Sequence, residues 1–254
     1  MSVTFDRLLN VAGAYNVRDL GGYAVREGET SWRRVLRADG LHRLAPESVE
    51  QLYDAGVRTV IDLRHADELA HQPNPFSGHR SVAYLNIPLF AQLAPQPAPA
   101  APAKDALLDL YLLALTTRKS AIRETLSAIA DATEGTVLFH CTAGKDRTGI
   151  IAALTLGIAG ADRSTIVSDY ALTGALIAPM IEDILAGAKA RGADIALLTP
   201  LLACQAETML AMLDHLDDNH GGVDGYLADI GLQTTSREKI RARLVGLEHS
   251  RKVT

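Results

Sequence analysis

The 254-residue sequence predicts an α/β fold with a mainly parallel central sheet flanked by helices. Three observations favour this fold. Short β-favouring runs alternate with longer amphipathic segments through the first 160 residues. The runs have the apolar density of parallel strands that are covered on both faces. Beyond residue 160 the pattern is helical only, which adds a group of helices to the sheet.

Each element rests on a local signal. Apolar, β-rich runs predict strands over residues 35–38, 57–64, 82–87 and 136–139. Pro46 at a helix start and Gly56 as a stop predict a helix over residues 46–55. Helical spacing of apolar residues predicts the remaining helices, at 105–115, 120–130, 163–172, 177–190, 197–216, 223–230 and 237–247, besides a buried helix that opens at Thr148.

Length and composition limit the class of protein. Residues 1–254 suit one domain, in which the Pro/Ala-rich stretch 91–103 is a surface loop without chemistry. A net charge of −5 and the absence of a basic run argue against nucleic-acid binding. No stretch is long and apolar enough for a membrane span and no signal peptide is visible, so we expect a cytoplasmic protein without an integral membrane segment, although secretion without a signal peptide stays open. The two cysteines do not make a disulfide framework or a metal site.

One stretch carries most of the chemistry. Residues 140–149 read His-Cys-Thr-Ala-Gly-Lys-Asp-Arg-Thr-Gly, between the predicted strand 136–139 and the buried helix. Backbone N–H groups in such a loop can turn inward, and the start of the helix directs a positive dipole end at the same point. The stretch therefore predicts a binding site for a phosphate or another oxyanion.

The side chains of this loop predict a nucleophile and its anchor. Cys141 faces a ring of N–H groups beside Lys145 and Arg147, which should lower its pKa and make it a nucleophile. Arg147 offers a planar fork of donors that can grip two phosphoryl oxygens through the transition state. Gly144 permits the backbone torsion of a tight cradle, and Thr148 can place a hydroxyl near the sulfur. Two further loop residues are expected against the phosphate, namely Thr142 and Ala143.

This loop resembles that of the bacterial tyrosine/serine protein phosphatase family, whose phosphate loop carries Gly-Lys-Asp-Arg. The resemblance extends over most of the chain through four further motifs, Asn-Val-Arg-Asp at 16–19, Val-Leu-Arg at 35–37, Asp-Leu-Arg at 62–64 and Asp-Tyr at 169–170. It implies the cysteine-phosphatase fold, hydrolysis through a phosphocysteine, and no metal or other cofactor. It also implies phosphotyrosine substrates, sometimes phosphoserine, phosphothreonine or phosphoinositides. In one member a helical pair covers the active site, which predicts a helical lid insertion here over residues 173–218.

The leaving phenolate needs a proton, and two aspartates are candidates for the general acid. Asp62 comes at the carboxyl end of a strand, where it should meet the loop, and the resemblance favours it. Asp146 lies in the loop between two cations, which keep it ionised. We therefore expect Asp62 to be the acid. For Asp146 we expect either an organising role in the loop or transfer of a proton in the second step.

Other residues near the loop allow two interpretations each. Lys145 either binds a second phosphate of the substrate or only lowers the pKa of the thiol. Arg64 is either a second cation for the substrate or an internal salt-bridge partner. His140 is expected to brace the loop, and Arg18 and Asp19 either staple a turn by pairing with each other or take a direct part.

Several functions stay open at this point. A phosphoinositide phosphatase is the first alternative to a protein phosphatase, and a sulfur-transfer or arsenate-reducing enzyme could use the same cysteine loop. A non-catalytic phosphate-binding module is a third alternative. The sequence does not decide the physiological substrate, the oligomeric state or any redox role of Cys204.

Overall fold

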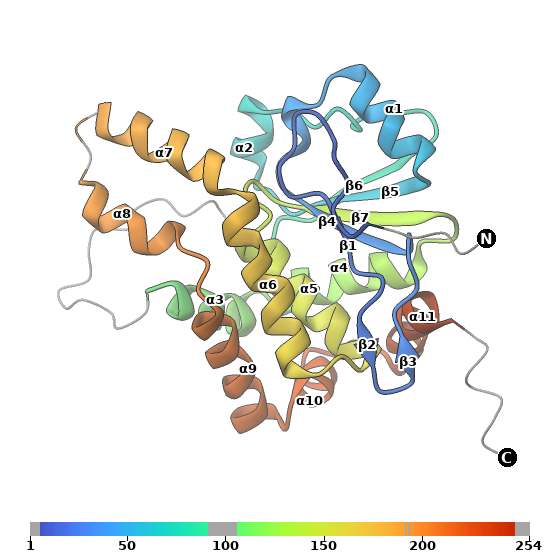
Figure 1. Ribbon diagram of the computed structural model, residues 1–254. Helices are drawn as coiled ribbons and strands as arrows, with labels where there is room; N and C mark the ends of the chain where they lie inside the picture. Colours follow the sequence, from blue (N-terminus) through green and yellow to red (C-terminus); the bar gives the residue numbers. More distant parts are fainter. Residues whose placement is uncertain (1–5, 91–105, 191, 193, 247–254) are drawn as a thin grey trace, which may run out of the picture.

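A five-stranded sheet forms the centre of the computed structural model, which describes residues 6–90, 106–190, 192 and 194–246 (Figure 1). The segment predicted as a Pro/Ala-rich loop, 91–103, lies outside these residues. In spatial order the strands are Arg18–Asp19 (β1), Val35–Ala38 (β4), Thr136–His140 (β7), Val57–Asp62 (β5) and Ala83–Asn86 (β6). All pairs are parallel except β1 with β4, so the predicted mainly parallel sheet is confirmed. Ala24–Val25 (β2) and Gly28–Glu29 (β3) pair separately.

The register of the strands brings their carboxyl ends to one edge of the sheet. His140 pairs with Ala38 on one side and with Asp62 on the other, and Asp62 pairs with Asn86. The segments that follow β4, β5 and β7 therefore leave the sheet next to one another. In a parallel sheet this is the edge where ligands bind.

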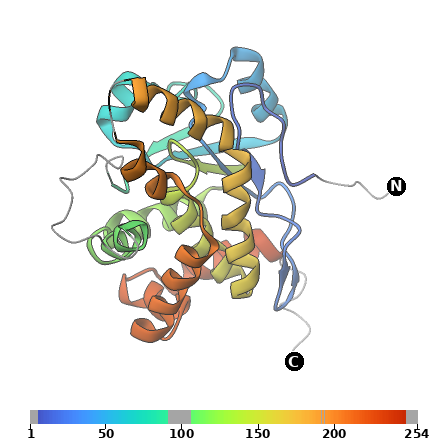
Figure 2. The ribbon, with the colours of Figure 1, turned by 60° about the vertical axis from the view of Figure 1, so that its left-hand side comes forward.

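Helices cover both faces of the sheet (Figures 1 and 2). One face packs against Pro46–Asp54 (α1), and Ala66–His71 (α2) follows β5 on the same side. The other face packs against Asp146–Ala159 (α5), which is buried along nearly its whole length because other helices surround it. These are Ala106–Thr117 (α3), Lys119–Asp131 (α4), Arg163–Leu176 (α6), Ala206–His220 (α9), Val223–Asp229 (α10) and Thr234–Val245 (α11).

Two further helices, Ala178–Ala190 (α7) and Ile195–Leu202 (α8), pack against each other away from the sheet, and we call them the cover helices (Figures 1 and 2). Among the described residues no single helix is both long and apolar enough to cross a membrane. The pair α6 and α7 meets that length and composition only together, with a bend of 54° between them.

The single helix predicted over residues 197–216 is wrong. The chain leaves the helical path after α8 and starts α9 at Ala206, because the carbonyl groups of Leu201 and Ala203 accept hydrogen bonds from Lys145. The methionines of α9 belong to the core, since Met209 and Met212 are fully buried. Within the predicted lid, 173–218, the part that forms α9 therefore packs one face against the core.

Of the two interpretations of Arg18 and Asp19, the one in which they pair with each other does not match the structure. Asp19 instead accepts hydrogen bonds from the backbone N–H groups of Gly21 and Arg33, and so closes the turn after β1. Arg18 points the other way, because successive side chains of a strand face opposite sides. It reaches Asp169 of α6, with 3.1 Å between its Nε and Oδ1.

A buried ionic cluster around Asp169 joins the sheet to α6. The Asp169 carboxylate receives Arg18 from β1 and Arg37 from β4, the latter at 2.5 Å, and the hydroxyl of Tyr23 donates to it at 2.8 Å. Burial would raise the pKa of Asp169, but the charges of Arg18 and Arg37 outweigh it and hold this pKa well below its usual range. The carboxylate is therefore ionised at neutral pH and balances two buried cations.

We predict that Asp169→Asn lowers the free energy of unfolding by about 3–5 kcal/mol, because it leaves two buried guanidinium groups without their counter-charge. The measurement is urea unfolding. Since the folded pKa of Asp169 is depressed, its contribution is present above the unfolded pKa of about 4 and is lost as the pH falls below that value.

The matched control is Asp131→Asn, which removes the exposed ion pair of Asp131 with Lys239 and should cost no more than about 1 kcal/mol. Equal losses for the two variants, or a loss at Asp169 that does not shrink in acid, would contradict the role assigned to the cluster.

Candidate active site

The loop after β7 is held in place from two sides. Gly144 has φ +65°, and a Cβ atom there would lie 2.6 Å from the carbonyl oxygen of Ala38, so a glycine is required. The carbonyl oxygen of Gly144 accepts hydrogen bonds from Arg37 at 2.8 Å and from Asn16 at 3.3 Å. The same Arg37 that binds Asp169 therefore holds the loop against the edge of the sheet.

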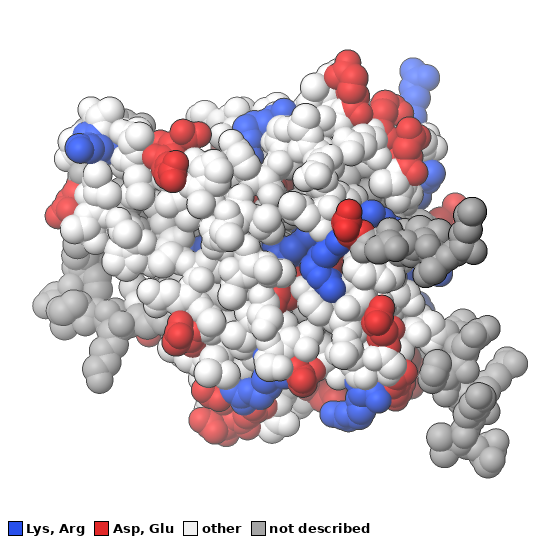
Figure 3. Space-filling model, viewed as in Figure 1, with Lys and Arg blue, Asp and Glu red and all other residues white. Residues whose placement is uncertain are grey.

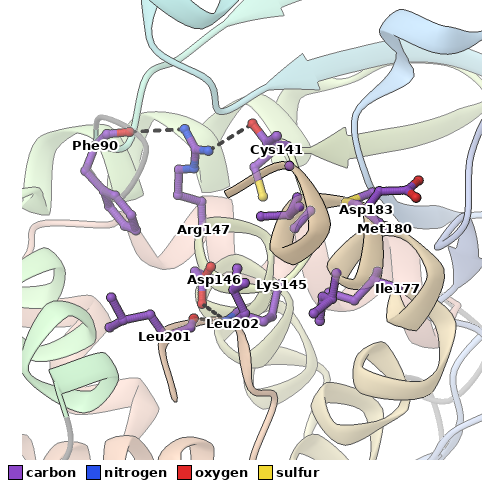
Figure 4. A pocket seen from close by; sticks show the side chains of 15 residues that line it. Phe90, Cys141, Lys145, Asp146, Arg147, Ile177, Met180, Asp183, Leu201 and Leu202 are labelled. Atoms are coloured by element: carbon purple, nitrogen blue, oxygen red, sulfur yellow. Dashed lines mark hydrogen bonds and ion pairs between the residues drawn. The ribbon is translucent and has the colours of Figure 1, made fainter. Parts of the chain in front are cut away.

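Cys141 lines a cavity of about 530 Å³ (Figure 4). The loop and the start of α5 form one wall, where the free N–H groups of the first helical turn can meet an anion. Of the loop residues expected against a phosphate, Thr142, Ala143 and Lys145 line the cavity, together with Asp146 and Arg147. Most of the remaining lining is apolar, and it comes from the cover helices through Met180, Ile181, Ile184 and Leu201, from Ile177 just before α7, and from Phe90.

Arg147 is held by a residue that the sequence analysis did not single out. Its NH1 and NH2 groups donate to the two carboxylate oxygens of Glu68 at 2.6 and 2.9 Å, and Thr142 also donates to Glu68. Burial would lower the pKa of Arg147, but the hydrogen bonds and charge of Glu68 outweigh it and raise this pKa. Arg147 is thus a fixed cation in the lining of the cavity. The spacing of His65 and Glu68, which form a capping box at the start of α2, is the one sequence signal for this residue.

Lys145 contacts the cover helices instead of facing open solvent. Its Nζ atom donates to the carbonyl oxygens of Leu201 at 2.6 Å and Ala203 at 3.0 Å, and lies 3.3 Å from Oδ1 of Asp146. Only 2% of its side chain is exposed. Lys145 therefore connects the loop directly to the end of α8 (Figure 4).

The two candidate acids occupy different places. Asp62 is fully buried outside the cavity, where it pairs with Arg64 at 2.7 Å and accepts a hydrogen bond from Asn74. Burial would raise the pKa of Asp62, but His140, followed by Arg64, holds it well below its usual range. The carboxylate of Asp62 is therefore bound in a buried ion pair with Arg64. Asp146 lines the cavity, with 16% of its side chain exposed.

The structure bears on the interpretation of both Asp62 and Arg64. Asp62 is not among the residues that line the cavity, although the strand ends there as predicted, and Arg64 folds back and binds its carboxylate. Arg64 is itself fully buried in that pair, so it is an internal salt-bridge partner and not a second cation that faces the cavity.

The residues next to the cysteine brace the loop. His140 is fully buried, with its Nδ1 3.0 Å from the carbonyl oxygen of Cys141 and its Nε2 2.8 Å from Asn74. This agrees with the bracing position expected for it. The Thr148 hydroxyl is buried and has no hydrogen-bond partner within the part of the chain that the structure describes.

We predict that Lys145→Met loosens the end of α8, because two charge-assisted hydrogen bonds to its carbonyl groups disappear. Backbone amides of α8 should exchange their hydrogens faster, by about tenfold or more, as followed by mass spectrometry. Lys189→Met makes the same substitution at an exposed lysine of α7 and should leave this exchange unchanged. Exchange in α8 that does not respond to Lys145→Met would show that Lys145 does not hold the cover.

Several known proteins are similar in sequence to this chain over most of its length. The chain is 31% identical over 215 residues to a tyrosine-protein phosphatase of Nostoc commune, which covers 82% of this chain and 73% of that protein. It is 29% identical over 279 residues to the triple specificity protein phosphatase PtpB of Mycobacterium tuberculosis, covering 92% of this chain and 98% of that protein. The crystal structure of TpbA from P. aeruginosa matches with a TM-score of 0.31 at 24% identity, over 71% of this chain and 86% of that one. The model of the tyrosine phosphatase family matches residues 9–246, and the chain belongs to this family.

Proposed function

We propose that this protein hydrolyses phosphotyrosine in proteins through a phosphocysteine intermediate at Cys141. The observation that carries the proposal is that Cys141 and Arg147 line the same cavity, at the start of α5. Membership of the tyrosine phosphatase family supports the same reaction. Two similar proteins are named as a tyrosine-protein phosphatase and a triple specificity protein phosphatase, so phosphoserine and phosphothreonine are reasonable further substrates.

In the first step of this mechanism the Cys141 thiolate attacks phosphorus, and the bond from phosphorus to the tyrosine oxygen breaks. Arg147 and the N–H groups of the loop stabilise the charge on the equatorial oxygens. Asp146 supplies the proton that the leaving phenolate needs. In the second step water attacks the phosphocysteine, Asp146 takes a proton from that water, and phosphate leaves with release of the thiolate. We assign the stabilisation of the departing sulfur to Thr148, whose buried hydroxyl has no hydrogen-bond partner among the residues that the structure describes.

The shape of the cavity supports an aryl phosphate over a bisphosphorylated inositide. Its apolar wall, which includes Ile177 and Met180, suits an aromatic ring. Lys145 and Arg64, the two cations considered for a second phosphate, are both buried and already paired. Acidic and basic side chains are interspersed on the face shown in Figure 3, and much of the surface over the cover helices is uncharged. These observations favour an aryl phosphate, and a phosphoinositide is the alternative substrate.

We include in this proposal that the cover helices act as a lid. The cover helices supply the apolar wall, and Lys145 ties α8 to the loop, which supports their action as a lid over the reacting phosphate. We place this lid within a single phosphatase domain. Its extent is narrower than the predicted insertion, because α9 packs in the core. The cytoplasm remains the expected location.

The function is tested by phosphate release from phosphotyrosine, phosphoserine and phosphothreonine peptides and from mono- and bisphosphorylated inositides. We predict turnover of the phosphotyrosine peptide above the inositides, and a loss of about 10³-fold or more in Cys141→Ser, because the nucleophile is removed. Higher turnover of the inositides would favour the alternative substrate. Binding without turnover by the intact protein would indicate a non-catalytic module, and turnover by Cys141→Ser at the parent rate would overturn the mechanism.

The choice of general acid is tested with leaving groups of different acidity. We predict that Asp146→Asn slows the hydrolysis of phenyl phosphate by about 10²–10⁴-fold, because its phenolate is a poor leaving group that needs a proton. Hydrolysis of an aryl phosphate whose phenol is strongly acidic should slow much less, because that phenolate leaves without a proton. Asp62→Asn is the comparison and should reduce both rates by the same factor. A selective loss with phenyl phosphate in Asp62→Asn, and equal losses with both substrates in Asp146→Asn, would identify Asp62 as the general acid.

A further inference from the structure

The hydroxyl of Tyr111 lies directly against the carboxylate of Asp146. Helix α3 brings Tyr111 to the first turn of α5, where its hydroxyl donates to Oδ1 of Asp146 at 2.8 Å. Tyr111 is fully buried, so this hydroxyl is held by packing and not by solvent. We infer that Tyr111 is a positioning residue for Asp146, which orients its carboxylate toward the cavity and determines the pH range in which it can donate a proton. The inference rests on the proposed function of Asp146 as the acid.

A second tyrosine fixes the direction of hydrogen-bond donation between Tyr111 and Asp146. The hydroxyl of Tyr170, on α6, lies 2.7 Å from that of Tyr111, and the two rings meet edge to face with an interplanar angle of 89°. Because the single hydroxyl proton of Tyr111 is donated to Asp146, Tyr111 must accept the proton of Tyr170. Burial raises the pKa of both tyrosines, so both stay neutral donors over the working pH range. The chain of hydrogen bonds therefore runs from Tyr170 through Tyr111 to Asp146.

The start of α5 is shaped to admit this pair. A Cβ atom on Gly149 would lie 3.0 Å from Cδ2 of Tyr170, closer than a side chain normally packs. The glycine that ends the loop motif thus lets the Tyr170 ring lie against the helix, within reach of Tyr111. This requirement concerns the support of the loop and not phosphate binding.

The surroundings of Asp146 leave one carboxylate oxygen for the reaction. Tyr111 and Lys145 both contact Oδ1, at 2.8 and 3.3 Å, and among the described residues no hydrogen bond is donated to Oδ2. The proton for the leaving group therefore belongs on Oδ2. Several charged or titratable groups lie close enough to act on Asp146, namely Lys145, Arg147, Tyr111, Tyr170 and Cys204. Asp183 of α7 lines the same cavity.

The test compares two tyrosine-to-phenylalanine variants of the full chain. A hydrogen bond donated to a carboxylate favours its ionised form, so Tyr111→Phe should let Asp146 keep its proton to higher pH. We expect the alkaline limb of kcat/KM for phenyl phosphate to move upward by about one pH unit, with kcat reduced about tenfold near neutral pH. Tyr170→Phe should move the limb in the same direction by less, because it only weakens the donor.

The matched control is Tyr226→Phe, another fully buried tyrosine, whose hydroxyl donates at 2.9 Å to the carbonyl oxygen of Leu115. Tyr226→Phe loses a comparable buried hydrogen bond to α3, but its kcat/KM for phenyl phosphate should keep the pH profile of the parent protein. A profile of Tyr111→Phe that superimposes on that of Tyr226→Phe would overturn the inference, since a merely structural role of Tyr111 predicts that result.

A second readout does not depend on turnover. The titration of the Asp146 carboxyl, followed by carbon-13 NMR and assigned by the loss of its signal in Asp146→Asn, should move upward in Tyr111→Phe. If the parent releases no phosphate, the proposed function fails while this titration still tests the contact. If the titration does not move, the positioning role fails even in an active enzyme.

Discussion

The carboxylate of Asp169, buried between two arginines, is the interaction on which the rest of the structure depends. It joins β1, β4 and α6 through Arg18 and Arg37, and Arg37 continues to the carbonyl oxygen of Gly144 in the loop. Such a group is costly to bury alone, so the three charges specify one arrangement of sheet, helix and loop. The position of the phosphate loop thus follows from ionic contacts far from the cysteine in the sequence.

Around the cavity, each ionic side chain of the loop has its own partner from another element. Glu68 of α2 holds Arg147, the end of α8 holds Lys145, and Tyr111 of α3 holds Asp146. Donors and charges that are fixed before the substrate arrives need little reorganisation during the reaction. The loop carries the reactive groups, while the surrounding helices orient them.

Much of the fold was predictable because it rests on local patterns. The strand 35–38 and the helix at Pro46 agree with the structure, since apolar runs and a proline at a helix start act over a few residues. Helix α2 was missed because it is short and has no buried residue, and Glu68 was missed with it. The break between α8 and α9 was missed because it depends on Lys145, more than fifty residues earlier.

The sequence by itself determined the reactive loop, because Cys141, Gly144 and Arg147 lie within seven residues between a strand and a helix. That spacing, together with His140 before it and Thr148-Gly149 after it, predicts an anion site. Only the tertiary structure decided which aspartate faces the cavity and what Lys145 contacts. Both questions turn on partners from distant segments: Asp62 is turned away by Arg64 and His140, and Lys145 is taken up by the end of α8. Residue type and spacing carry no information about such contacts, because they form only when the whole chain has packed.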